Sequence, residues 1–252
     1  MTECPHNAAA TAGPASLPDV AEDRFKDFVQ ARDFPCVGAK AALVRGALET
    51  RTLGDLQSNA DDLALWLALS DFAKRLEPGS MVVQSFVVIF PDTPQLSEVG
   101  FEHALWSRLQ GLHYIDTQMG QGWSKNTTND PGENNFSLSI AGESFFVIGL
   151  HPGASRPARR FDHAALVFNS NAQFEALRAD GRYDQMKRII RERDEALAGS
   201  INPMLRDFGQ GSEAAQYSGR MVGDDWSCPF KARRAVTLPV RPDAQVLFEA
   251  AE

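Results

Sequence analysis

The chain has 252 residues, of which 43% are hydrophobic and 23% are charged, a balance typical of a soluble globular protein. Its 25 Lys and Arg against 33 Asp and Glu give a formal net charge of −8. This charge disfavours general nucleic-acid binding, whose affinity comes from neutralising phosphates. The longest apolar runs have only the length of a strand, and no signal peptide is recognisable, so we expect neither a membrane span nor secretion. Three cysteines form no disulfide framework and favour a reducing cytoplasm.

The N-terminal third is predicted to be helical after a disordered tail at residues 1–17. A helix from Pro18 is interrupted by Phe34-Pro-Cys-Val-Gly38, because a residue that precedes proline disfavours the helical conformation. We expect further helices at residues 39–50 and 61–76. The second of these has a broad apolar face, made of Leu63, Trp66, Leu67, Leu69 and Phe72.

The sequence pattern in the middle of the chain predicts several strands and one long helix. Residues 81–90 are rich in Val, Ile and Phe and predict a central strand, and a helix is expected from Ser97 to about Asp116. After a polar loop at residues 120–135, two apolar runs at 136–140 and 144–150 flank Ala141-Gly-Glu143, which is typical of a hairpin. Residues 165–168 predict another short strand.

Helices are expected again at residues 170–179 and 183–198, and the remainder is mostly irregular. With no repeat and no linker, the simplest architecture is one α+β domain over residues 18–232, in which helices pack on a small, mainly antiparallel sheet. Residues 233–252 would be a C-terminal extension.

One loop concentrates groups that could hold a ligand. The segment His151-Pro-Gly-Ala-Ser-Arg-Pro-Ala-Arg-Arg-Phe161 directly follows a predicted buried strand. It carries one imidazole, the hydroxyl of Ser155 and the guanidinium groups of Arg156, Arg159 and Arg160. Clustered arginines favour a ligand with carboxylates or phosphates, and His151 adds a possible metal ligand or proton carrier.

The other histidines and the cysteines are weaker candidates. His103 and His113 lie ten residues apart on one predicted helix, roughly 80° around its axis, so they do not form a chelating pair. Cys36 and Cys228 each neighbour a proline, and a free cysteine commonly acts as a small buried hydrophobic residue. No CxxC or HxxxH spacing indicates a zinc site.

Motifs for several enzyme classes are missing from the sequence. It contains no nucleotide-binding GxGxxG followed by an acidic residue, no GxxxxGK[ST], no GxSxG and no HExxH. A second polar region near the C-terminus holds Glu213, Gln216, Tyr217 and Arg220. These residues could cap the sheet or form a polar wall around a substrate.

Several ordered segments resemble the YqcI/YcgG family. They include Phe34-Pro-Cys-Val-Gly38, Leu105-Trp-Ser-Arg-Leu-Gln-Gly-Leu-His113, the Phe145–Phe161 segment with HPGASRPARRF, Phe168-Asn169 with Gln173-Phe174, Ser200-Ile-Asn-Pro-Met-Leu205, Ser212-Glu213 with Gln216-Tyr-Ser-Gly-Arg220, and Trp226 with Cys228-Pro-Phe230. Together these segments cover most of residues 24–230.

The resemblance implies a function that the residues alone do not. The better understood members of the family look like haem-dependent oxygenases that N-hydroxylate guanidino groups, so a b-type haem, O₂ and an external electron donor are expected. The axial ligand would be His151, with His113 and Cys36 as alternatives. Ser155 and the three arginines would hold the haem propionates.

A guanidinium substrate would need a buried carboxylate, for which Glu213 and Asp116 are candidates, with Tyr217 as a hydrogen-bond donor. Two other readings stay open. The protein could be a non-catalytic haem- or anion-binding protein, which would use the same arginines. It could also be a scaffold without a ligand, whose arginines point to solvent or pair with acidic side chains.

Overall fold

Five strands form one open sheet at the centre of the protein. The computed structural model describes residues 17–77, 79, 80, 82–204 and 211–236. The strands are β1 (Leu48–Thr52), β2 (Ser85–Phe90), β3 (Leu138–Ile140), β4 (Glu143–Leu150) and β5 (Ala164–Ser170), in the spatial order β1-β2-β5-β4-β3. Among the strands of the described residues, β1 and β2 pair in parallel and the other neighbouring pairs are antiparallel.

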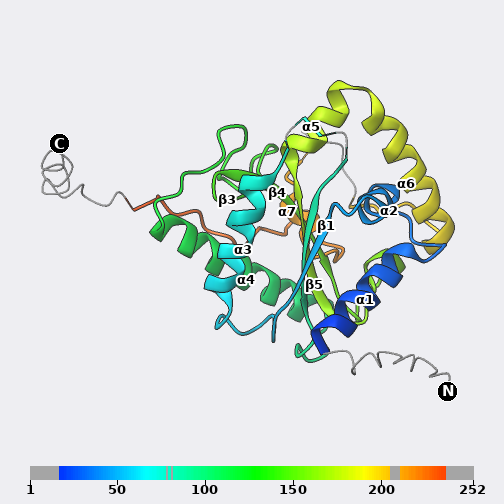
Figure 1. The fold of residues 1–252 in the computed structure, drawn as a ribbon, viewed down its shortest axis with the longest axis horizontal. Helices are drawn as coiled ribbons and strands as arrows, with labels where there is room; N and C mark the ends of the chain where they lie inside the picture. Colours follow the sequence, from blue (N-terminus) through cyan, green and yellow to red (C-terminus); the bar gives the residue numbers. More distant parts are fainter. Residues whose placement is uncertain (1–16, 78, 81, 205–210, 237–252) are drawn as a thin grey trace, which may run out of the picture.

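Helices cover both faces of this sheet. They are α1 (Leu17–Gln30), α2 (Val37–Val44), α3 (Asp62–Arg75), α4 (Glu98–Gln118), the short 3₁₀ helix η1 (Pro157–Arg159), α5 (Asn171–Ala179), α6 (Arg182–Ala198) and α7 (Ala214–Tyr217). Helices α3 and α4 lie on one side of the sheet, and α1, α2 and α6 lie on the other (Figure 1). The predicted fold class, one α+β domain with a mainly antiparallel sheet, is confirmed. No helix of the described residues is long and apolar enough to cross a membrane.

The predicted hairpin is confirmed as β3 and β4, with Ile140 opposite Glu143. Its two turn residues, Ala141 and Gly142, have φ angles of 54° and 78°. Two consecutive positive φ angles are the geometry that two-residue hairpins favour, because their twist matches that of the strands.

The helix predicted at residues 39–50 is wrong in its second half. Helix α2 ends at Val44, Gly46 has a φ of 65°, and the chain continues as strand β1. Glycine adopts positive φ without a steric cost, so it ends the helix readily. The following residues pair in parallel with β2, a long-range contact that local helix propensity does not reveal.

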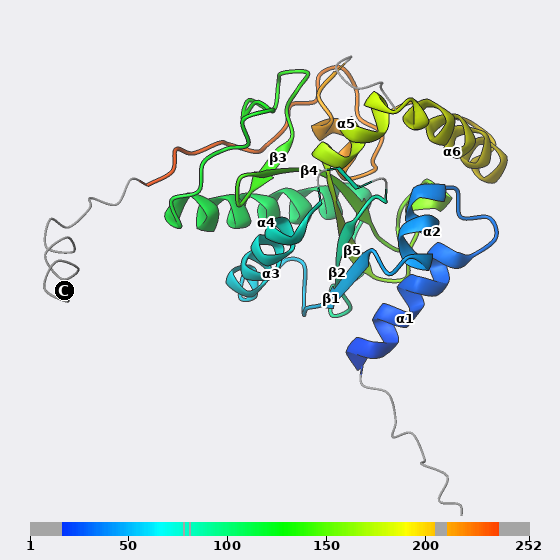
Figure 2. The same ribbon diagram turned by 45° about the horizontal axis from the view of Figure 1, so that its top comes forward.

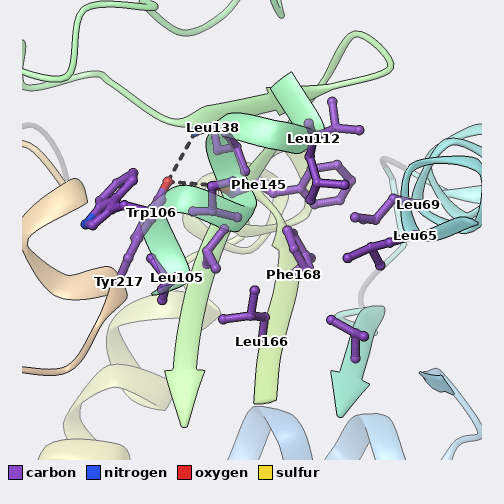
Figure 3. Packing of buried hydrophobic residues seen from close by; sticks show 14 of the residues in the cluster. Leu65, Leu69, Leu105, Trp106, Leu112, Leu138, Phe145, Leu166, Phe168 and Tyr217 are labelled. Carbon is purple, nitrogen blue, oxygen red and sulfur yellow. Dashed lines mark hydrogen bonds between the residues drawn. The ribbon is translucent and has the colours of Figure 1, made fainter. Parts of the chain in front are cut away.

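The face of the sheet that carries α3 and α4 is densely packed. Figure 3 shows part of this cluster, in which Leu65 and Leu69 of α3 and Leu105 of α4 meet side chains of the sheet. The predicted apolar face of residues 61–76 is too broad, because Leu63 and Leu67 are 49% and 51% exposed.

A buried ion pair joins the two helices of this layer. Arg108 of α4 donates to Asp62 at the start of α3 and to the backbone carbonyls of Asp55, Leu56 and Ser58. These carbonyls accept hydrogen bonds from the guanidinium group, which burial would otherwise leave without partners. The loop before α3 is thereby fixed to α4.

The predicted terminal segments are described only in part. Residues 1–16 and 237–252 lie outside the described residues. The first residues of the predicted extension run along α4, where the amide of Arg233 donates to His113 Nε2 and the amide of Val236 donates to the Thr117 carbonyl.

Helix α4 approaches β4 so closely that only glycine fits at position 149. A Cβ atom there would lie 2.6 Å from Phe101 and 2.8 Å from Leu105. We therefore expect Gly149→Ala to lower the free energy of unfolding by about 1–3 kcal/mol, as overpacking of a tight core does. Urea denaturation measures this change.

Gly122→Ala is the matched control for this prediction, because a Cβ at Gly122 would meet no atom within 4 Å. Equal stability of the two variants would contradict the close approach of α4 to β4.

Candidate functional site

A cavity of about 310 Å³ lies on the α1/α2 side of the sheet, beneath helix α6. Residues of the strands, of α1 and α2 and of α6 line it. Figure 2 shows where α1, α2 and α6 lie beside the sheet. The main apolar lining residues are Phe25, Val29, Leu48, Phe146, Ile148, Val167, Met186 and Ile190.

Helix α6 covers the cavity without packing tightly. It packs against α2, α5 and η1, yet none of its apolar side chains is buried, and Asp194 is its one buried residue. Arg156 of the loop after β4 forms an ion pair with Asp194 and also donates to Ser200 just beyond the helix. This ion pair holds the C-terminal half of α6 over the sheet.

The charged residues that line the cavity are mainly cationic. Arg156, Arg159, Arg178, Lys187 and Arg191 outnumber Asp194 and Glu213 along the described wall. Within the part of the chain that the structure describes, Nε of Arg156 is buried and has no hydrogen-bond acceptor. An anionic oxygen in the cavity would satisfy this donor.

Cys36 contributes a thiol to the cavity wall. It is the N-cap of α2, where its sulfur accepts a hydrogen bond from the amide of Ala39 at 3.4 Å. Burial raises the pKa of this thiol, while the amides of Ala39 and Gly38 and the charge of Arg159 act in the opposite direction. Exposed amides at a helix N-terminus favour a thiolate.

The structure does not bring the three predicted arginines together at one site. Arg159 lines the cavity and donates to the carbonyls of Gly149, Gln216 and Tyr217, and desolvation lowers its pKa to about 10. Arg160 turns back to the carbonyls of Ala154 and Ser155. Ser155 is exposed, its amide donates to Glu98, and neither it nor Arg160 lines the cavity.

His151, the first predicted metal ligand, lies on the other side of the sheet. Its ring stacks on Phe101 of α4 with centroids 4.2 Å apart, and its Nδ1 has no hydrogen-bond partner among the described residues. The preceding residue, Leu150, does line the cavity. Successive residues of a strand point to opposite faces, which explains the difference.

His113 and Asp116 are also buried on the α4 side. The His113 ring contacts Trp123 and Phe230. Asp116 Oδ1 accepts hydrogen bonds from Trp66 Nε1 and from the amide of Ala141, and so fixes α3 and the β3–β4 turn to α4. Neither His113 nor Asp116 lines the cavity.

Glu213 places a buried carboxyl group at the polar end of the cavity. Its side chain has hydrogen bonds with Tyr217, Ser137 and Asn171, and the Tyr217 hydroxyl lies 2.6 Å from Oε1. Desolvation raises the pKa of Glu213 to about 7 despite these partners. The carboxyl group is therefore close to half ionised at neutral pH.

Tyr217 is fully buried directly behind Glu213. Its hydroxyl accepts from the amide of Leu138 and also lies 3.0 Å from the Phe145 carbonyl, as Figure 3 shows. Burial and the neighbouring Glu213 raise its pKa well above the usual value. Arg220, from the same predicted polar region, instead pairs with Glu102 of α4.

Sequence reasoning missed the contribution of α6 and of the strand ends. Tyr183, Lys187, Ile190 and Asp194 share one side of the helix, and this helical spacing could have indicated a common wall. Asn169 and Asn171 lie where β5 ends and α5 begins, and although Asn169 belongs to a segment that resembles the family, neither was predicted as a site residue. Among the described residues, no group of three His, Cys, Asp or Glu side chains could hold a metal ion.

The fold and the site define an α+β protein with a cavity of ligand size, whose charged lining residues are mainly cationic. The chain belongs to the YqcI/YcgG family, whose sequence profile matches residues 25–231. No curated protein and no solved structure matches the chain significantly.

The two buried histidines make a contribution to stability that should be lost in mild acid. Burial lowers the pKa of both His113 and His151 from 6.5, so the neutral forms stabilise the fold above pH 6.5 and this contribution is lost as the pH falls through the lowered values. Glu213, whose pKa is raised to about 7, stabilises the fold as it takes up a proton over the same range. The histidine contribution is therefore measured as a difference between variants, from urea denaturation at pH 7.5 and at pH 5.5.

Between pH 7.5 and 5.5 the His113→Gln variant should gain stability relative to the wild-type protein, because glutamine does not titrate and still offers an acceptor to the amide of Arg233. His103→Gln, at an exposed position of the same helix, serves as the control. An unchanged pH dependence in His113→Gln would exclude His113 as a source of the effect.

Proposed function

We propose that this protein is a haem-dependent monooxygenase that N-hydroxylates a guanidino or amino small molecule, using O₂ and a cytoplasmic electron donor. The observation that carries the proposal is the cavity, because a thiol, cationic groups and a buried carboxyl group line the same space. Its volume of about 310 Å³ lies within the range of about 300–1,000 Å³ that is usual for small-molecule sites.

The chain's own residues fit a haem in this cavity. Of the three predicted axial ligands only Cys36 belongs to the lining, and thiolate is an established ligand of haem iron. Coordination removes the proton of a thiol, which would overcome the effect of burial on Cys36. Arg156, with its unsatisfied Nε, and Arg159 would pair with the propionates. The bound haem would supply the activation of O₂.

Glu213 is the proposed anchor of the substrate cation. Its carboxyl group is buried and is oriented by Tyr217, Ser137 and Asn171, so little reorganisation is needed when a guanidinium group binds. In its ionised form the group would pair with the cation, and in its neutral form it could donate a proton. Asp116, the other predicted anchor, is occupied by Trp66 and Ala141 outside the cavity.

The alternative function is non-catalytic binding of haem or another anion. The cationic lining supports it as well, since such a protein would need Arg156 and Arg159 but no substrate carboxyl group. Arg156 also pairs with Asp194, as was expected for a scaffold without a ligand. Turnover of a guanidino compound with reductant and O₂ distinguishes an enzyme from both.

Removal of the Cys36 thiol tests the proposed haem ligand. The Cys36→Ser variant keeps an N-cap side chain but should lose at least about tenfold in haem affinity, since even changes around metal ligands cost 10- to 100-fold. The measurement is an absorption titration with haem, in which the wild-type protein should develop a Soret band.

Cys228→Ser is the matched control, because Cys228 is also a half-buried free cysteine but lies outside the cavity lining. Full haem affinity in Cys36→Ser, with loss in His151→Gln, would move the ligand to His151. A wild-type protein whose spectrum does not change with added haem would refute the proposed function.

Glu213→Gln tests the substrate anchor. We expect binding of L-arginine or methylguanidine to the haem-loaded protein to weaken by about 2–5 kcal/mol, the usual effect of removing one partner of a buried charge pair. In the wild-type protein, affinity should rise between pH 6 and 8, because Glu213 ionises with a pKa of about 7. Calorimetry measures both.

The control for the anchor is Glu143→Gln, which changes another carboxyl group with a burial-raised pKa, hydrogen-bonded to Ser170 and outside the cavity. Equal affinity in Glu213→Gln and the wild-type protein would exclude Glu213 as the anchor while leaving haem binding open.

A further inference from the structure

We infer that Tyr217, Trp106 and Trp226 form a chain for single-electron transfer between the cavity wall and the protein surface, with Glu213 as the acceptor of the Tyr217 proton. The inference rests on the proposed function for the source of the oxidant, a one-electron oxidant formed when O₂ is reduced at haem in the cavity. Its geometry, however, is independent of haem.

The three aromatic rings are in sequence from the cavity outward. The rings of Tyr217 and Trp106 stack with centroids 5.4 Å apart and an interplanar angle of 17°, and Figure 3 shows the two side chains together. Trp226 follows at 6.5 Å from Trp106. Electron tunnelling weakens steeply with distance, so rings in direct contact exchange electrons far faster than a single step across the same span.

The inner end of the chain has a route for a proton. Loss of one electron from a phenol makes its hydroxyl strongly acidic, and the Glu213 carboxylate lies 2.6 Å from that hydroxyl. Glu213 also lines the cavity. Oxidation of Tyr217 therefore sends the electron to the oxidant and the proton to Glu213, which leaves a neutral phenoxyl radical.

Trp106, the middle ring of the electron-transfer chain, has no such route for a proton. Nε1 of Trp106 is buried, and among the described residues it has no hydrogen-bond partner. Transfer of an electron from Trp106 to the Tyr217 radical is uphill, because the phenol regains its proton from Glu213 whereas the indole stays a protonated radical cation. It is completed only when a reductant removes the hole at the outer end, and without a reductant the hole rests on Tyr217. This cation is a stronger oxidant than a deprotonated indole radical, so it takes an electron readily from the next ring.

The outer end reaches solvent. Trp226 is half-buried and is preceded by the exposed carboxylates of Asp224 and Asp225. A reductant in solution can return one electron to the oxidised Trp226, and a cationic reductant is favoured by the two carboxylates. The complete transfer moves one electron from that reductant to the cavity. This transfer would reduce an oxidant that forms in the cavity when no substrate is bound.

A photochemical experiment tests the chain without haem. The sequence contains three tyrosines, so Tyr114→Phe combined with Tyr183→Phe leaves only the fully buried Tyr217. A light flash with tris(bipyridine)ruthenium(II) and persulfate oxidises residues at the surface. We expect a phenoxyl radical in the electron paramagnetic resonance spectrum, since the hole moves inward to the tyrosine that can release its proton to Glu213.

Five further substitutions in this background identify the route. Trp106→Phe should lose the phenoxyl signal to the background level of Tyr217→Phe, whereas Trp66→Phe, which also changes a buried indole, should keep it. Trp226→Phe should lower the signal, whereas Trp123→Phe, which changes another half-buried indole, should not. Circular dichroism checks that each variant is folded.

The inference is overturned if the double variant gives no phenoxyl radical or if Trp106→Phe gives the same yield as Trp66→Phe. If Trp106→Phe does not fold, the comparison of Trp226→Phe with Trp123→Phe decides, and equal yields overturn the chain. Because the experiment uses no haem, its failure is distinct from failure of the haem titration.

Discussion

The ion pair between Arg156 and Asp194 is the contact on which the arrangement of the site depends. It joins the loop after β4 to α6, and thereby keeps a helix with no buried apolar side chain above an apolar sheet face. A helix normally gains its stability by burying an apolar face. Since α6 buries its apolar side chains only partly, a ligand that fills the cavity would add the missing contact and bind more tightly for it.

The two faces of the sheet therefore serve different purposes. On the α4 side, Gly149 lets α4 approach β4, and Arg108 ties α4 to α3 and its preceding loop, which leaves a dense and rigid layer. On the α6 side, the same strands present the floor of a cavity. A rigid layer behind the floor keeps the lining side chains in place when a ligand binds.

Glu213 and Tyr217 connect these two sides. Glu213 faces the cavity, while the Tyr217 ring reaches the aromatic cluster of Trp106 and Phe136 under α4. The pair gives the proposed oxygenase a carboxyl group that can change its protonation near neutral pH, and it places an oxidisable phenol directly behind that group. The proposed substrate anchor and the proposed electron-transfer chain thus share the hydrogen bond between Glu213 and Tyr217.

The sequence by itself determined much of the fold, because hairpin signals, strand composition and helical periodicity are local properties. It identified the β3–β4 hairpin, the long helix α4 and the family, and four of the residues that it proposed for the site, Cys36, Arg156, Arg159 and Glu213, line the cavity. Residues 48–52 became a strand, against their local pattern, through pairing with β2. Which residues of one loop share the cavity was decided only by tertiary structure. A strand directs neighbouring side chains to opposite faces, so Leu150 enters the cavity while His151 lies under α4.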